Sequence, residues 1–69
     1  MKWDVYYINS LVLTLQRRET KKGIVWDHIY DELDDIYSAE QAIEQIDKNL
    51  DKKEITWGQK NQWKAVRVE

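Results

Sequence analysis

The chain has no cysteine, so neither a disulfide nor a cysteine-based zinc site can hold its 69 residues together. A domain of this length buries only about 60% of the surface that its unfolded chain exposes, which leaves it marginally stable. Apolar burial must therefore stabilise the fold, and self-association could add to it. Four Trp and four Tyr suit this role, because each large ring buries about 150–250 Å². This aromatic content argues against disorder, and we expect a single small domain over residues 1–69.

The first third of the chain is β-prone. Residues 2–8 are rich in aromatic and β-branched side chains, which favours a strand. From Leu11 onward, apolar and polar residues alternate with period two, which predicts a second strand over 11–19 with one buried face. The polar segment that ends at Gly23 suits a hairpin turn, because glycine adopts positive φ without strain. The sequence therefore predicts an N-terminal antiparallel sheet.

Residues 24–37 fit two structures. Their composition favours a third strand over 24–31 followed by a loop, whereas their apolar residues also recur three or four positions apart, as in a helix. A helix would stack Asp27, Asp31, Asp34 and Asp35 along one face, where like charges destabilise it by a few tenths of a kcal/mol per pair. We prefer the strand and leave the helix open.

An amphipathic helix is expected over residues 38–52. Ser38 and Gln41 match a capping box, in which each side chain satisfies a backbone amide of the first turn. One face of this helix is apolar and carries Ala39, Ala42, Ile43, Ile46 and Leu50. The opposite face is acidic and carries Glu40, Glu44, Asp47 and Asp51. The apolar stripe is typical of a helix that covers one face of a sheet.

The tail returns to β-prone residues at 54–57 and 63–68, separated by a polar turn. It predicts either a hairpin or one strand after an irregular loop. The expected fold is therefore α+β, a small antiparallel sheet of three or more strands packed by one amphipathic helix in the order β-β-β-α-β.

Charge is segregated along the chain. The net charge is +3 over residues 1–24, −8 over 25–51 and +3 over 52–69, which together give −2. Such asymmetry can steer a partner or pair one copy of the chain with another. Alternatively, the two signs solvate different elements and attract each other within the fold.

Catalysis and metal binding find little support. His28 is the single histidine, the two glycines cannot form a phosphate loop, and no serine lies in a nucleophile-elbow motif. Asp27, His28, Asp31, Asp34 and Asp35 lack the spacing of a calcium loop and are better explained as a solvated acidic loop. We expect no enzyme, cofactor, metal site or small-molecule substrate. No apolar run is long enough to span a bilayer or serve as a signal peptide, so a cytoplasmic location without membrane contact is expected.

Two groups of basic and aromatic residues are candidate interaction sites. The first comprises Arg17, Arg18, Lys21 and Lys22 near the expected hairpin tip, and the second comprises Trp57, Lys60, Trp63, Lys64 and Arg67. Cations contact phosphates and rings stack on unpaired bases, so nucleic-acid binding is one hypothesis. However, the pI of about 5.3 is low for such a domain.

Binding to a protein partner, including a second copy, is the preferred hypothesis, because Trp, Tyr and Arg dominate interface hot spots. The acidic helix face is an alternative surface for a basic partner. No motif assigns a family. In size, cysteine content and charge balance, the chain resembles the small accessory proteins that phages and mobile elements encode.

Overall fold

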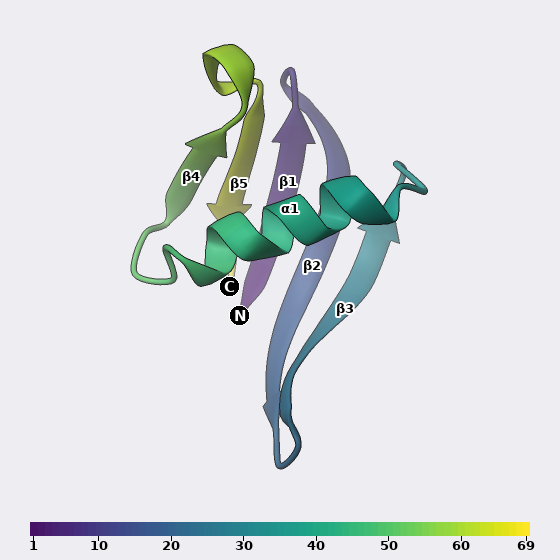
Figure 1. Cartoon of the computed structure of the whole chain (residues 1–69), viewed down its shortest axis with the longest axis vertical. Coiled ribbons are helices and arrows are strands. Elements are labelled where there is room, and N and C mark those ends of the chain that lie inside the picture. Colours follow the sequence, from purple (N-terminus) through teal and green to yellow (C-terminus); the bar gives the residue numbers. More distant parts are fainter.

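The computed structural model covers residues 1–69 and contains one five-stranded antiparallel sheet with one helix lying across it (Figure 1). The strands are ordered β3-β2-β1-β5-β4 across the sheet. The elements are β1 (Lys2–Tyr7), β2 (Ser10–Thr20), β3 (Gly23–Asp31), α1 (Ile36–Asp47), β4 (Glu54–Trp57), the 3₁₀ turn η1 (Gln59–Asn61) and β5 (Trp63–Arg67). No helix in this fold is both long and apolar enough to cross a membrane.

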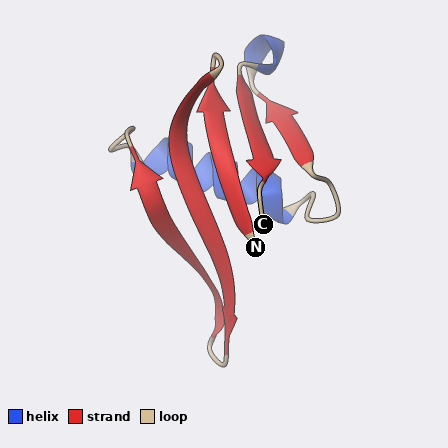
Figure 2. Cartoon of the chain, turned by 180° about the vertical axis from the view of Figure 1, so that it is seen from behind, coloured by secondary structure: helices blue, strands red, loops and turns tan.

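The α+β prediction is confirmed, and two open alternatives are resolved. The segment after Gly23 is the strand β3 rather than a helix, and the tail forms the complete hairpin β4–β5. The element order is therefore β-β-β-α-β-β. Strand β5 pairs with β1, which inserts the C-terminal hairpin beside the first strand and places the two termini close together (Figure 2).

The core lies between α1 and one face of the sheet. Trp3 and Val5 of β1 and Leu13 and Leu15 of β2 are fully buried there. The helix contributes most of the expected stripe, in which Ala39, Ala42 and Ile46 are buried and Ile43 is partly buried against the same cluster. Leu50, the last residue of the predicted stripe, is also partly buried there but lies in the turn after the helix. Small alanine side chains let the helix approach the large indole and leucine side chains closely. Burial of a side chain such as Ile46 stabilises the fold by about 1.5–3 kcal/mol.

The opposite face of the sheet has no helix over it (Figure 2). Its strands therefore carry polar side chains that pair across the sheet, as is common where one side of an antiparallel sheet faces water. Thr14 donates a hydrogen bond to Asp4 Oδ1 at 2.9 Å, and Lys64 Nζ lies 5.4 Å from the centre of the Tyr6 ring.

Strands β2 and β3 continue beyond the rest of the sheet as a two-stranded ribbon (Figure 1). Pairing between β1 and β2 ends at Lys2 and Gln16, whereas pairing between β2 and β3 continues to Thr20 and Gly23. We call the residues 18–25 the ribbon. Because no third strand or helix lies beside it, most of its side chains are exposed.

The helix begins earlier and ends earlier than predicted. It spans Ile36–Asp47 instead of 38–52, and its N-cap is Asp35 instead of Ser38. The backbone N–H of Tyr37 donates to Asp35 Oδ1 at 3.1 Å, and the Ser38 hydroxyl donates to Asp35 Oδ2 at 2.7 Å. Gln41 donates to the Tyr37 hydroxyl, so the capping box is wrong. Aspartate and serine are equally good N-cap residues, and Asp35, which lies nearer the end of β3 than Ser38, takes the N-cap position.

This cap assignment can be tested by a pair of substitutions. Asp35→Ala removes both hydrogen bonds at the start of α1 and should lower the free energy of unfolding by about 0.5–2 kcal/mol. Ser38→Ala leaves the N-cap in place and should change it by less than about 0.5 kcal/mol. Urea unfolding followed by tryptophan fluorescence measures both. An equal or larger loss for Ser38→Ala would restore the capping box.

Candidate interaction surfaces

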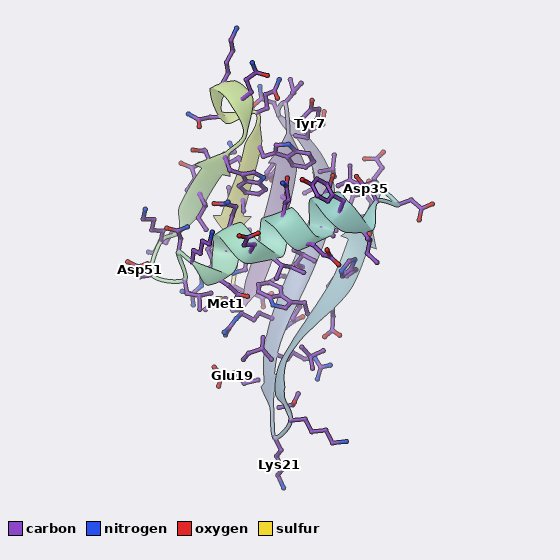
Figure 3. The ribbon with its side chains drawn as sticks, in the orientation of Figure 1. Met1, Tyr7, Glu19, Lys21, Asp35 and Asp51 are labelled. Atoms are coloured by element: carbon purple, nitrogen blue, oxygen red, sulfur yellow. The ribbon has the colours of Figure 1, made fainter.

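The two predicted basic groups lie in different parts of the molecule, and the outermost residues of each, Lys21 with Lys22 and Lys60, are at opposite ends of its longest dimension of 38 Å. Lys21 and Lys22 form the tip of the ribbon, and the Lys21 side chain extends into solvent (Figure 3). Lys60 lies in the turn η1 at the other end, between β4 and β5. The fold therefore divides the predicted basic residues into separate surfaces.

The two arginines near the ribbon are neutralised within the chain. Arg17 Nε lies 3.4 Å from Asp47 Oδ1 on α1, and Arg17 Nη1 lies 3.6 Å from Glu19. Arg18 forms a two-point contact with Asp27 on the neighbouring strand. By contrast, neither tip lysine forms an ion pair. The positive charge still available at this end therefore belongs to Lys21 and Lys22, which we call the basic tip.

The tryptophans of the second group pack on the helix side of the sheet. Trp57 and Trp63 stack with ring centres 6.0 Å apart, and Tyr7 lies 4.6 Å from Trp63. Both indoles are half-buried against the core cluster. Because side chains alternate along β5, Lys64 points to the opposite face of the sheet from Trp63. Rings and cations that are adjacent in the sequence therefore do not form one surface. Arg67 lies at the end of β5, where its Nε donates to the backbone oxygen of Glu69.

Strand β3 is one edge of the sheet, and its outer side carries no other element. It contains neither proline nor lysine, the residues that most often protect an edge from pairing. Four of its apolar side chains are exposed: Ile24, Val25, Ile29 (55%) and Tyr30 (43%). A β-bulge at Ile29 shifts the register with β2. The other edge, β4, is only four residues long.

Acidic side chains gather where β3 leads into α1. We call Asp31, Glu32, Asp34 and Asp35 the acidic corner; Asp35 is labelled there in Figure 3. Asp31 Oδ1 accepts from the backbone N–H groups of Leu33 and Asp34, and its Oδ2 lies 3.1 Å from His28 Nδ1. A shallow cavity of about 400 Å³ opens beside them. No three of these side chains converge in a way that could hold a metal ion.

The predicted acidic helix face is partly neutralised. Asp47 pairs with Arg17, and Glu44 pairs with Lys48 one turn along the helix at 2.9 Å. Glu40 is exposed on the helix, whereas Asp51 lies beyond its end in the connection to β4 (Figure 3). This face therefore has less free charge than its sequence suggests.

A second cavity, of about 320 Å³, lies at the end opposite the basic tip. Strands β1, β4 and β5, the β1–β2 turn and η1 all contribute to it. Its lining residues are Tyr6, Ile8, Asn9, Thr56, Lys60, Asn61, Gln62 and Lys64. Sequence reasoning selected the two lysines and missed the others, because nothing in the sequence shows that the two turns lie side by side. The one indication in the sequence was the turn-forming tendency of Asn9 and Asn61, which marks both segments as turns but not as neighbours.

Comparisons with known proteins do not assign the chain to a group. No family model matches it, and neither the curated proteins nor the solved structures contain a match.

Acid titration should report the ion pair between Arg18 and Asp27. The hydrogen bond from Arg18 lowers the pKa of Asp27 below its ordinary value of 3.8. A lowered pKa in the folded state means that ionisation favours folding above pH 3.8, and that this contribution is lost as pH falls through the folded pKa. Arg18→Gln should raise the pKa of Asp27 towards 3.8, as measured by NMR of the carboxyl carbons.

Asp31 is the internal control for this titration. A hydrogen bond with His28 lowers the pKa of Asp31, so this pKa should stay low in the Arg18→Gln variant. A shift of both carboxyl groups together would instead indicate that the substitution disturbs the whole edge strand.

Gly58 is required for the connection between β4 and β5. Its φ is +86°, and a Cβ at this position would lie 2.9 Å from Trp63 Cδ1. Gly58→Ala should therefore lower the free energy of unfolding by about 1–3 kcal/mol, measured in urea. Gly23→Ala is the matched control, because Gly23 also has positive φ but has open space around it. Gly23→Ala should lower the free energy of unfolding by less than Gly58→Ala does. An equal decrease for both variants would mean that contact with Trp63 is unimportant.

Proposed function

We propose that this protein is a non-enzymatic interaction module that binds a second copy of itself through the exposed edge of β3. The observation that supports this most strongly is the distribution of charge along that edge. The basic tip lies at one end of β3, the acidic corner lies at the other, and the exposed apolar side chains lie between them.

An antiparallel arrangement of two β3 strands uses this distribution twice. With a two-fold axis near Asp27, the basic tip of each copy lies beside the acidic corner of the other. Val25 then lies close to Ile29 of the second copy, which covers apolar surface that is exposed in the single chain. A two-fold interface requires such a self-complementary surface. A parallel arrangement would instead bring tip against tip and corner against corner.

The central charge and the bulge define how this pairing works. Asp27 lies near the axis and would face its own copy, but Arg18 already neutralises it. The bulge at Ile29 interrupts regular hydrogen bonding along the edge. Backbone pairing is therefore confined to residues 26–28 around the axis, and the contacts beyond them are made by side chains.

Charge exchange provides the sharpest test. In one variant Lys21→Glu and Lys22→Glu reverse the basic tip, and in the other Glu32→Lys and Asp34→Asn reduce the acidic corner. The first variant places like charges together, and the second lowers the charge of the acidic corner from −4 to −1 and so removes most of the attraction. The dimer of each variant alone should be at least about tenfold weaker than that of the native chain, whereas a heterodimer regains one native contact between tip and corner. Mixed together, the two variants should form a heterodimer. Sedimentation velocity across concentration measures all three samples.

Lys52→Glu with Lys53→Glu is the matched control. It makes the same change in net charge as the first variant, but in the connection between α1 and β4, away from the β3 edge, and should leave dimerisation unchanged. A native chain that remains monomeric at all concentrations would refute the proposal. Variants that fail to recover on mixing would refute the antiparallel arrangement.

Nucleic-acid binding is the second candidate, supported by the shape of the ribbon. A two-stranded ribbon fits the major groove of B-DNA, and the tip presents two unpaired lysines. Titration of labelled single- and double-stranded oligonucleotides tests it, since phosphate-driven affinity must fall as salt rises. An absence of binding at low salt would exclude this function. We favour self-association because neutralisation of Arg17 and Arg18 leaves little positive charge along the ribbon.

A further inference from the structure

We propose that the cavity between the β1–β2 turn and η1 binds a phosphoryl group of a small phosphorylated ligand. This site is separate from the β3 edge and does not depend on self-association. It lies at the end of the molecule opposite the basic tip (Figure 1).

The charge of the cavity points to an anion. Two of the eight lining residues, Lys60 and Lys64, carry positive charge, and none carries negative charge. This balance is the reverse of that of the whole chain, whose net charge is −2. The nearest acidic partner is Glu54, which lies 3.9 Å from Lys64 Nζ on the neighbouring strand. At that distance and on an exposed surface the pair is weak, so a dianion can compete for Lys64.

Lys64 is held in position. Its ammonium lies over the Tyr6 ring, 5.4 Å from the ring centre, and its side chain is 38% exposed. A cation over an aromatic face is attracted by the ring. Less conformational entropy is therefore lost when Lys64 binds an anion than when a freely rotating surface lysine does.

The remaining polar side chains are available for hydrogen bonds. Lys64 is the one lining residue whose side chain forms an ion pair within the chain. The other polar side chains of the lining form no hydrogen bond or ion pair within the chain: Tyr6, Asn9, Thr56, Lys60, Asn61 and Gln62. Carboxamide N–H groups and ammonium groups donate to phosphate oxygens, and bonds to a charged acceptor are the stronger kind.

The backbone around the cavity is strained. Five non-glycine residues in the chain have positive φ, and four of them line this cavity: Ile8, Asn9, Lys60 and Asn61. For the β-branched Ile8, a φ of +45° is particularly unfavourable. The Ile8 N–H donates to the Gln62 carbonyl at 2.9 Å and ties the two turns together. Such strain costs about 1–3 kcal/mol per residue and clusters at functional sites, where it fixes the positions of binding groups.

The size of the cavity indicates a small ligand. Ligand pockets typically enclose about 300–1,000 Å³, so 320 Å³ lies at the lower end of this range. Because Lys64 covers the Tyr6 ring, that ring is not free to stack on a base. The recognised group is therefore the phosphoryl group itself, carried by a compact molecule such as a nucleoside monophosphate or a sugar phosphate, rather than an unpaired nucleobase.

Amide NMR titration of the full chain tests the site. The probes are inorganic phosphate, adenosine monophosphate and a single-stranded oligothymidine, each compared with sodium chloride at the same ionic strength. We expect phosphate and adenosine monophosphate to shift the amides of residues 8–9 and 60–64. Lys60→Gln and Lys64→Gln should each weaken binding about tenfold, since each removes a charge-assisted hydrogen bond. Lys52→Gln with Lys53→Gln should leave it unchanged.

The outcomes are distinct. Saturable shifts that depend on Lys60 and Lys64 support the site. If the oligothymidine binds, per phosphate, at least as tightly as adenosine monophosphate, the small-ligand assignment would be overturned in favour of a nucleic-acid backbone. Shifts that sodium chloride reproduces, or that survive both single substitutions, would overturn the site altogether.

Discussion

The packing of α1 across one face of the sheet is the contact on which the rest of the structure depends. Its alanines, Ala39 and Ala42, bring the helix close to the buried rings and leucines of the central strands. The chain has no disulfide and no third layer to support this contact. A helix of twelve residues covers only the middle of the sheet. The ribbon, the β3 edge and the connection around η1 therefore remain outside the core, and both proposed binding surfaces are found there.

The fold uses part of its segregated charge and leaves part of it free. Arg17 and Arg18 pair with Asp47 and Asp27, which joins the basic first segment of the chain to the acidic second one. The unpaired charge is concentrated at the basic tip, at the acidic corner and beside η1, where no neighbouring element supplies enough opposite charge to neutralise it. Self-association would satisfy two of these places with each other. Beside η1, Lys60 has no ion pair and Lys64 has only a weak one with Glu54, so the proposed anion would contact both lysines.

The main elements of the fold could be predicted from the sequence because each follows from a local pattern. Alternation from Leu11 gave β2, and the apolar stripe from Ala39 to Leu50 gave the helix and its buried face. The helix boundaries could not be predicted correctly, because Asp35 and Ser38 are both good capping residues and the path of the chain out of β3 decides between them. The basic and aromatic residues were identified, but their grouping was not, because strand alternation places Trp63 and Lys64 on opposite faces.

By itself, the sequence determined the α+β class, the amphipathic helix and the excess of acid in the middle of the chain. These depend on residue type and on spacing between near neighbours. Tertiary structure alone decided that β3 is an edge, that β5 pairs with β1, and that two turns 50 residues apart enclose one cavity. Strand order and the meeting of distant turns are set by contacts between residues far apart in the chain, and no local pattern records which distant segment each strand will meet.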